Sequence, residues 1–164
     1  IRIVQSAGSR VILDTEGAPL RDGCTADAFL IKANASEASE LTGSQIVSLS
    51  DASAAVVMLH ALGAQRVAIS LGKSGAVYSD GENIWCAEPP LIKEQNPIGA
   101  GDALVAGIIW GFCNNYAGEE VIRWGVACGA SAASLPGTAM GSRAQVESLA
   151  GQVRINASRL VTNT

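Results

Sequence analysis

Short apolar runs alternate with a helix-forming stretch over the first seventy residues of this 164-residue chain. A helix is predicted over 51–62, with Ser50 as its N-cap and Gly63 as its stop, because its apolar residues recur at helical spacing. Parallel strands need crossover connections, which are usually helical. The pattern therefore predicts βαβ units in a three-layer α/β/α domain. The expected strands cover 11–13, 28–31 and 66–71.

The second half of the chain is expected to begin with a β-hairpin and to continue in helices. Turn residues at 80–82 separate two strand-like segments, 75–79 and 83–87. Residues 1–8 have the pattern of the last turns of a helix that ends at a glycine. The helices expected after the hairpin cover 101–114, 118–134 and 143–151.

Composition narrows the classes of function. Hydrophobic residues make up 48% of the chain and aromatic residues 4%, so the core must consist mostly of Ala, Val, Ile and Leu. A net charge of −4 argues against nucleic acid or an anionic membrane as the main partner. The four cysteines form no C-x-x-C pair, which argues against a zinc site and favours free thiols in a reducing cytoplasm. No apolar segment has the length of a membrane span, and we expect a soluble, cytoplasmic protein.

The sequence Asn96-Pro97-Ile98-Gly99-Ala100-Gly101-Asp102 is the strongest functional motif. Its glycines permit a tight turn, and the apolar run after it predicts a buried helix. The backbone N–H groups of Gly99, Ala100 and Gly101 are expected to be unpaired at the helix N-terminus, where an anion can bind. Asp102 in the same turn can accept a proton during phosphoryl transfer. An ordinary glycine-rich turn remains the alternative.

In parallel α/β sheets, ligands bind outside the carboxyl ends of the strands. This rule places Asp14, residues 32–34, residues 70–72 and the Gly99 loop along one edge of the expected sheet. In that order the motifs resemble the C-terminal half of the PfkB carbohydrate kinases, which have the ribokinase-like fold. The resemblance is greatest to the sugar-phosphate branch, and it rests on the segments 11–17, 32–37, 70–76 and 99–102.

The resemblance implies a role for each matching residue. Asp102 is expected to be the general base, with Gly99, Ala100 and Gly101 as the backbone anion hole. Asn34 and Glu37 match an Asn-x-x-Glu element that helps to bind the Mg²⁺ accompanying ATP; a helix capping box explains the same spacing. The residues expected to contact ATP are Lys32, Asn34, Ser70, Gly72, Gly75, Ala130 and Ala133. Tight turns explain the two glycines, and close helix packing the two alanines, equally well.

The expected function is ATP-dependent phosphoryl transfer to a hydroxyl of a sugar or sugar phosphate. Residues 1–164 are expected to form the C-terminal nucleotide-binding and catalytic portion of such a kinase, without the family's N-terminal strands and lid. The alternative is a non-catalytic nucleotide-binding or interaction module. A sugar phosphate is the expected small-molecule partner. An uncovered sheet edge would also favour a homo-oligomer.

Overall fold

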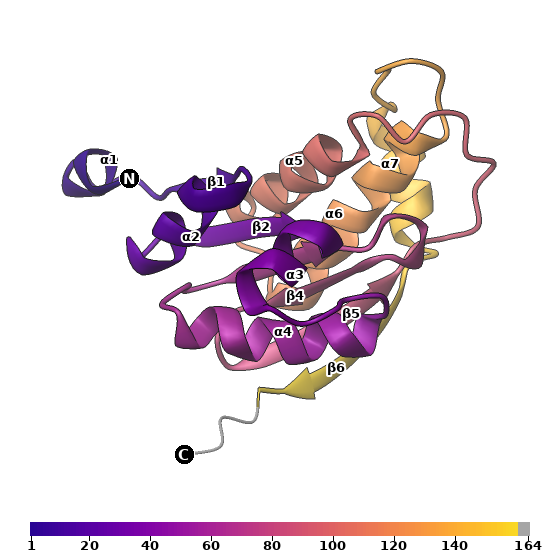
Figure 1. Cartoon of the computed structure of the whole chain (residues 1–164). Coiled ribbons are helices and arrows are strands. Elements are labelled where there is room, and N and C mark those ends of the chain that lie inside the picture. The colour runs from indigo at the N-terminus through magenta and orange to yellow at the C-terminus, as the bar shows by residue number, and fades with distance from the viewer. Residues whose placement is uncertain (161–164) are drawn as a thin grey trace. The chain divides into compact units, whose positions relative to one another are not determined.

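The computed structural model describes residues 1–160 (Figure 1). These residues fall into two compact units. Among the described residues, the first unit comprises residues 1–71, 77–84 and 158–160. The second comprises residues 72–76 and 85–157. The six strands follow the order β1-β2-β3-β4-β5-β6 in a mixed sheet, and with the helices they form the α/β fold that the sequence predicts.

The first unit contains two parallel crossover connections. Strand β1 pairs in parallel with β2, and β2 with β3, as the sequence predicts. Helix α2 connects the first pair, while α3 and α4 connect the second. The elements are α1 (Arg2–Ser6), β1 (Ile12–Asp14), α2 (Gly17–Thr25), β2 (Leu30–Asn34), α3 (Ala35–Thr42), α4 (Leu49–Ala61) and β3 (Val67–Ser70).

The core of the first unit surrounds β2. Residues 30–33 are all buried, as expected for a parallel strand covered on both faces. Helix α4 presents a stripe of small and branched apolar residues at helical spacing. Those buried residues are Ala52, Ala55, Val56 and Leu59.

The start of α4 corrects one prediction. Its N-cap is Ser48 instead of Ser50, because Ser48 and Asp51 form a reciprocal capping box. The Asp51 N–H donates to Ser48 Oγ at 3.1 Å, and the Ser48 N–H donates to Asp51 Oδ2 at 2.9 Å. At the other end the helix stops at Ala61, with Leu62 as the C-cap and Gly63 following at a φ of 112°.

The second unit is dominated by three helices. Helices α5 (Ala100–Cys113), α6 (Gly118–Ala133) and α7 (Arg143–Ala150) closely match the predicted spans. The expected hairpin is also present, as β4 (Ala76–Ser79) and β5 (Asn83–Glu88), preceded by the short 3-10 helix η1 (Gly72–Ser74). Strand β4 and the start of β5 belong largely to the first unit. Strand β6 (Arg154–Arg159) has no counterpart in the sequence prediction.

Helices α5 and α6 lie side by side in Figure 1, and small residues permit their close contact. A Cβ atom built on Gly107 would lie 2.5 Å from the Trp124 carbonyl oxygen and 2.8 Å from Gly125 Cα. No real side chain tolerates such distances. Gly107 is therefore required by packing.

Within residues 1–160, no helix combines the length and apolar character needed to cross a membrane.

Candidate active site

The carboxyl ends of three parallel strands bring four predicted residues to one edge of the first unit. Asp14, Asn34 and Ser70 are the last residues of β1, β2 and β3. The strand register pairs Asp14 with Lys32 and Asn34 with Ser70. Polar side chains at this edge are in the position where ligands of parallel sheets bind.

Lys32 is a buried cation. Its Nζ atom donates to Asp14 Oδ1 at 2.9 Å and to Asp14 Oδ2 at 3.1 Å. The Lys32 side chain is only 8% exposed, and that of Asp14 is 27% exposed. A buried charge requires a partner, and Asp14 supplies the opposite charge for Lys32.

Asn34 and Glu37 form the capping box of α3. Asn34 Oδ1 accepts from the Glu37 N–H at 3.0 Å. In return, Glu37 Oε2 accepts from the Asn34 N–H at 2.7 Å, and Glu37 Oε1 accepts from Asn34 Nδ2 at 2.6 Å. Helix capping is therefore a correct explanation of this motif. A second role in binding Mg²⁺ must be compatible with these bonds.

The donor set at Asn34 and Glu37 fits a weakly held Mg²⁺. Residues 1–160 contain no group of three or more His, Cys, Asp or Glu side chains that could form a protein cage for a metal. Mg²⁺ usually keeps several waters and binds through one or two carboxylates. Each oxygen of Glu37 retains acceptor capacity beyond its one bond to Asn34. Contact through water therefore fits the residues present.

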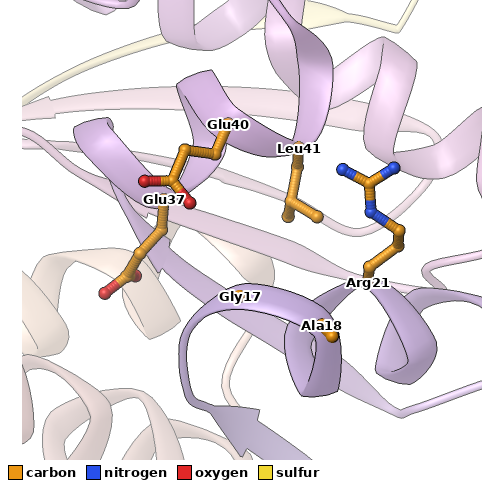
Figure 2. Close-up of a pocket in the computed structure, with 6 residues that line it drawn as sticks. All are labelled: Gly17, Ala18, Arg21, Glu37, Glu40 and Leu41. Atoms are coloured by element: carbon orange, nitrogen blue, oxygen red, sulfur yellow. The ribbon is translucent and has the colours of Figure 1, made fainter.

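A pocket of about 250 Å³ lies between α2 and α3 (Figure 2). Gly17 and Ala18 line it from the first turn of α2, and Glu40 and Leu41 line it from α3. Arg21 and Glu37 complete the lining. Sequence reasoning missed this pocket because it did not predict α2. Helix α2 was not predicted because Gly17, Pro19 and Gly23 interrupt its apolar pattern.

In the second unit, Gly99 is the N-cap of α5 and adopts a left-handed conformation with a φ of 81°. Among residues 1–160, the backbone N–H groups of Gly99, Gly101 and Asp102 have no hydrogen-bond acceptor. The prediction for Ala100 is wrong, because its N–H donates to the Pro97 carbonyl at 3.1 Å and so closes the turn. The unpaired donors in this turn are therefore the N–H groups of Gly99, Gly101 and Asp102.

Two bonds from Asn96 fix the loop before α5. Asn96 Oδ1 accepts from the Ile98 N–H at 3.1 Å, and Asn96 Nδ2 donates to the Gly137 carbonyl at 2.8 Å. The backbone N–H of Asn96 also donates to the Ala133 carbonyl at 3.2 Å. The C-terminal end of α6 therefore anchors the loop that leads to Gly99.

Asp102 lies in the first turn of α5 with an exposed side chain. Within the described part of the chain, it makes no hydrogen bond and no ion pair. Its carboxylate is therefore available to accept a proton from a bound hydroxyl. The neighbouring unpaired N–H groups can stabilise negative charge on a phosphoryl group.

The remaining predicted residues have identifiable structural roles. Gly72 and Gly75 have φ values of 55° and 106° in the turn before β4, and a side chain on Gly75 would collide with the Ala87 carbonyl. Ala130 and Ala133 are buried on α6. Turn formation and close packing account for these four residues, and contact with a nucleotide remains a prediction.

Comparison with known proteins identifies relatives. Residues 1–144 match the model of the pfkB family carbohydrate kinases. The 1-phosphofructokinase of Vibrio cholerae is 32% identical over 94% of this chain and 49% of its own length. The ATP-dependent 6-phosphofructokinase isozyme 2 of Escherichia coli is 34% identical over 84% of this chain and 45% of its own. This chain therefore spans about half the length of these relatives.

Solved structures show the same fold. Phosphofructokinase-2 from E. coli, in complex with substrates and products, matches with a TM-score of 0.84 at 32% identity, over 91% of this chain and 49% of that one. Ribokinase from Arabidopsis thaliana, complexed with ribose and ATP, matches with a TM-score of 0.79 at 26% identity. The match covers 91% of this chain and 50% of the ribokinase chain. These findings confirm the resemblance found in the motifs. The chain belongs to the pfkB family of carbohydrate kinases.

Proposed function

We propose that this chain is the nucleotide-binding and catalytic portion of a kinase that transfers a phosphoryl group from ATP to a hydroxyl of a sugar phosphate. One observation carries the proposal: the left-handed Gly99 begins α5 beside unpaired backbone N–H groups, with the exposed carboxylate of Asp102 in the same first turn. Phosphoryl transfer is achieved chiefly by positioning and electrostatic stabilisation, and this arrangement supplies both.

Asp102 acts on the acceptor. Its carboxylate takes the proton from the attacking hydroxyl as that oxygen bonds to the γ-phosphorus of ATP. The bond from this phosphorus to the β-phosphate oxygen breaks in the same transfer, and ADP leaves with that electron pair. The N–H groups of Gly99 and Gly101 donate to the phosphoryl oxygens, whose negative charge changes during transfer. Ala100 takes no part in this anion hole through its N–H, since that group is bonded to Pro97.

The residues assigned to the nucleotide are Lys32, Asn34 and Ser70 of β2 and β3, Gly72 and Gly75 of the turn before β4, and Ala130 and Ala133 of α6. Asn34 and Glu37 hold Mg²⁺ through water. When bound, Mg²⁺ neutralises charge on the ATP phosphates.

The names of the relatives support a sugar phosphate as the acceptor, because they include both 1-phosphofructokinase and 6-phosphofructokinase. One solved relative is a tetrameric inhibited form of E. coli phosphofructokinase-2, which supports a homo-oligomer here. Four free cysteines support a cytoplasmic location.

The test is ADP release by the full-length protein with Mg-ATP. Fructose 1-phosphate, fructose 6-phosphate and tagatose 6-phosphate are compared as acceptors. Turnover of roughly 1–100 s⁻¹ with one of them is expected. Absence of turnover with all three, in a folded protein that binds ATP, would contradict the kinase assignment and favour a nucleotide-binding module.

A further inference from the structure

The ion pair of Lys32 with Asp14 differs from the other ion pairs formed by residues 1–160. In the other four, the acidic side chain is between 39% and 50% exposed. The acid of the Lys32 pair is 27% exposed and the lysine itself 8%. A buried pair seldom stabilises a fold more than apolar residues of the same size. A contribution to the stability of the fold is therefore a weak explanation for the presence of this buried pair.

The ammonium of Lys32 retains an unused donor. An ammonium group has three N–H bonds. Both contacts of Lys32 Nζ go to the oxygens of Asp14, and the described residues offer it no other partner. One N–H is thus left for an acceptor that the protein itself does not supply. The buried site makes an unsatisfied donor unfavourable, so a ligand oxygen would complete it.

The backbone also fixes the two side chains relative to each other. Asp14 and Lys32 are register partners on β1 and β2, so the strand pairing holds their Cα atoms side by side. A free lysine side chain has many rotamers, and fixing it at the moment of binding reduces affinity. The bidentate contact with Asp14 fixes it in advance.

We propose that Asp14 is a positioning residue, which holds the Lys32 ammonium so that its remaining N–H donates to a phosphoryl oxygen of the bound nucleotide. This inference rests on the proposed function, in which Lys32 contacts ATP. Since the pair is neutral overall, Lys32 acts mainly through one oriented, charge-assisted N–H bond. Asp14 makes no contact with the nucleotide and acts only through Lys32.

A double-mutant cycle on this chain tests the inference. Mg-ATP affinity is measured by calorimetry for the wild type, Asp14→Asn, Lys32→Met and the double variant. Charge-assisted hydrogen bonds predict that Lys32→Met weakens binding about tenfold or more. Asp14→Asn should weaken binding severalfold when Lys32 is present and have little effect in the Lys32→Met background. Equal weakening in both backgrounds, or none in either, would overturn the positioning role.

A second readout does not depend on the nucleotide. Acylation of Lys32 by acetic anhydride, followed by mass spectrometry, reports how firmly the ammonium is held. We expect slow acylation in the wild type and faster acylation in Asp14→Asn. Wild-type rates in the variant would contradict the positioning role. Failure of the wild type to bind Mg-ATP would instead contradict the proposed function and, with it, the phosphoryl contact.

Two further variants distinguish a specific effect of Asp14 from a general loss of structure. Asp14→Ser is measured beside Asp14→Asn, so that the result does not depend on one variant folding. Glu88→Gln breaks the exposed ion pair with Arg154 in the second unit. That control should leave both the Mg-ATP affinity and the acylation of Lys32 unchanged.

Discussion

Both carboxylate oxygens of Glu37 accept hydrogen bonds from Asn34, one from its backbone N–H and one from its side-chain amide. The residue proposed to serve Mg²⁺ is thus also part of a helix cap. A direct metal contact would compete with these bonds, whereas a contact through water would not. The two roles can be separated by experiment.

We expect Glu37→Gln to raise the Mg²⁺ concentration that the full-length enzyme needs for half-maximal activity. Glutamine keeps a capping box, so the melting temperature should change little. Activity is titrated with Mg²⁺, and unfolding is followed by circular dichroism. Asp51→Asn is the matched control, because Asp51 caps α4 in the same way and has no proposed metal role. A fall in melting temperature at unchanged Mg²⁺ dependence would leave only the capping role for Glu37.

Asp102→Asn should reduce turnover of the full-length enzyme by about 10²-fold or more, because a general base is lost. The affinity for ATP should change much less, since Asp102 is assigned to the acceptor hydroxyl. Steady-state kinetics and nucleotide titration separate the two effects. Glu147→Gln removes a carboxylate on α7 and should leave turnover unchanged. Turnover of Asp102→Asn near the wild-type value would show that another group takes the proton.

Gly99→Ala should lower both stability and turnover. A Cβ atom at Gly99 would meet nothing within 4 Å, so the only local penalty is the left-handed backbone, about 1 kcal/mol. Gly8 has a φ of 78° and equally open surroundings. Gly8→Ala is therefore the matched control: it should lose similar stability in chemical denaturation and keep full turnover. Equal turnover in both variants would argue that the conformation of Gly99 is unimportant for the anion hole.

The sequence predicts those elements whose pattern is local. Residues 28–31 form an uninterrupted apolar stretch, and the helices after Gly99 have long runs of small apolar residues. The strand itself covers Leu30–Asn34, so the prediction of 28–31 placed it too early in the chain. Helix α2 escaped prediction because Gly17, Pro19 and Gly23 break the helical pattern. Strand β6 was not predicted because its residues are mostly polar and exposed and do not alternate between apolar and polar.

The residues of the candidate site also divide into those whose arrangement depends on local sequence and those whose arrangement depends on the fold. The helix start at Gly99 and the cap at Asn34 depend on neighbours in sequence, and both could be inferred. The pairing of Lys32 with Asp14 depends on the register between two strands, which sequence does not specify. The bond from the Ala100 N–H to Pro97 depends on the exact turn, and it removes one of the three predicted donors.

Gly107→Ala should destabilise the second unit by several kcal/mol or prevent its folding, because overpacking against backbone atoms cannot be relieved by moving a side chain. The added methyl group would lie 2.5 Å from the Trp124 carbonyl oxygen. Gly151→Ala is the control, since its nearest contact would be 3.8 Å away and its φ is −62°. Urea denaturation compares the two. A loss in Gly107→Ala no larger than in Gly151→Ala would contradict the close approach of α5 to α6.

Stability should fall in strongly alkaline solution because of Tyr78. Burial, with a smaller contribution from the Asp80 charge, raises the pKa of its hydroxyl from 10.0 to about 12, against the opposing effects of the Arg66 charge and hydrogen bond. Between these two values the unfolded chain loses the proton while the folded chain keeps it. The unfolded state therefore binds fewer protons, and the free energy of unfolding decreases as pH rises through this range.

The decrease approaches about 1.4 kcal/mol per pH unit within that window and is absent below pH 9. Denaturation of the wild type and of Tyr78→Phe, measured from pH 8 to pH 12, checks this. Phenylalanine has no proton to lose, so the variant should show a flatter profile, although the loss of the Arg66 bond lowers its stability at every pH. Parallel profiles for the two proteins would show that Tyr78 ionises in the folded state as readily as in the unfolded one.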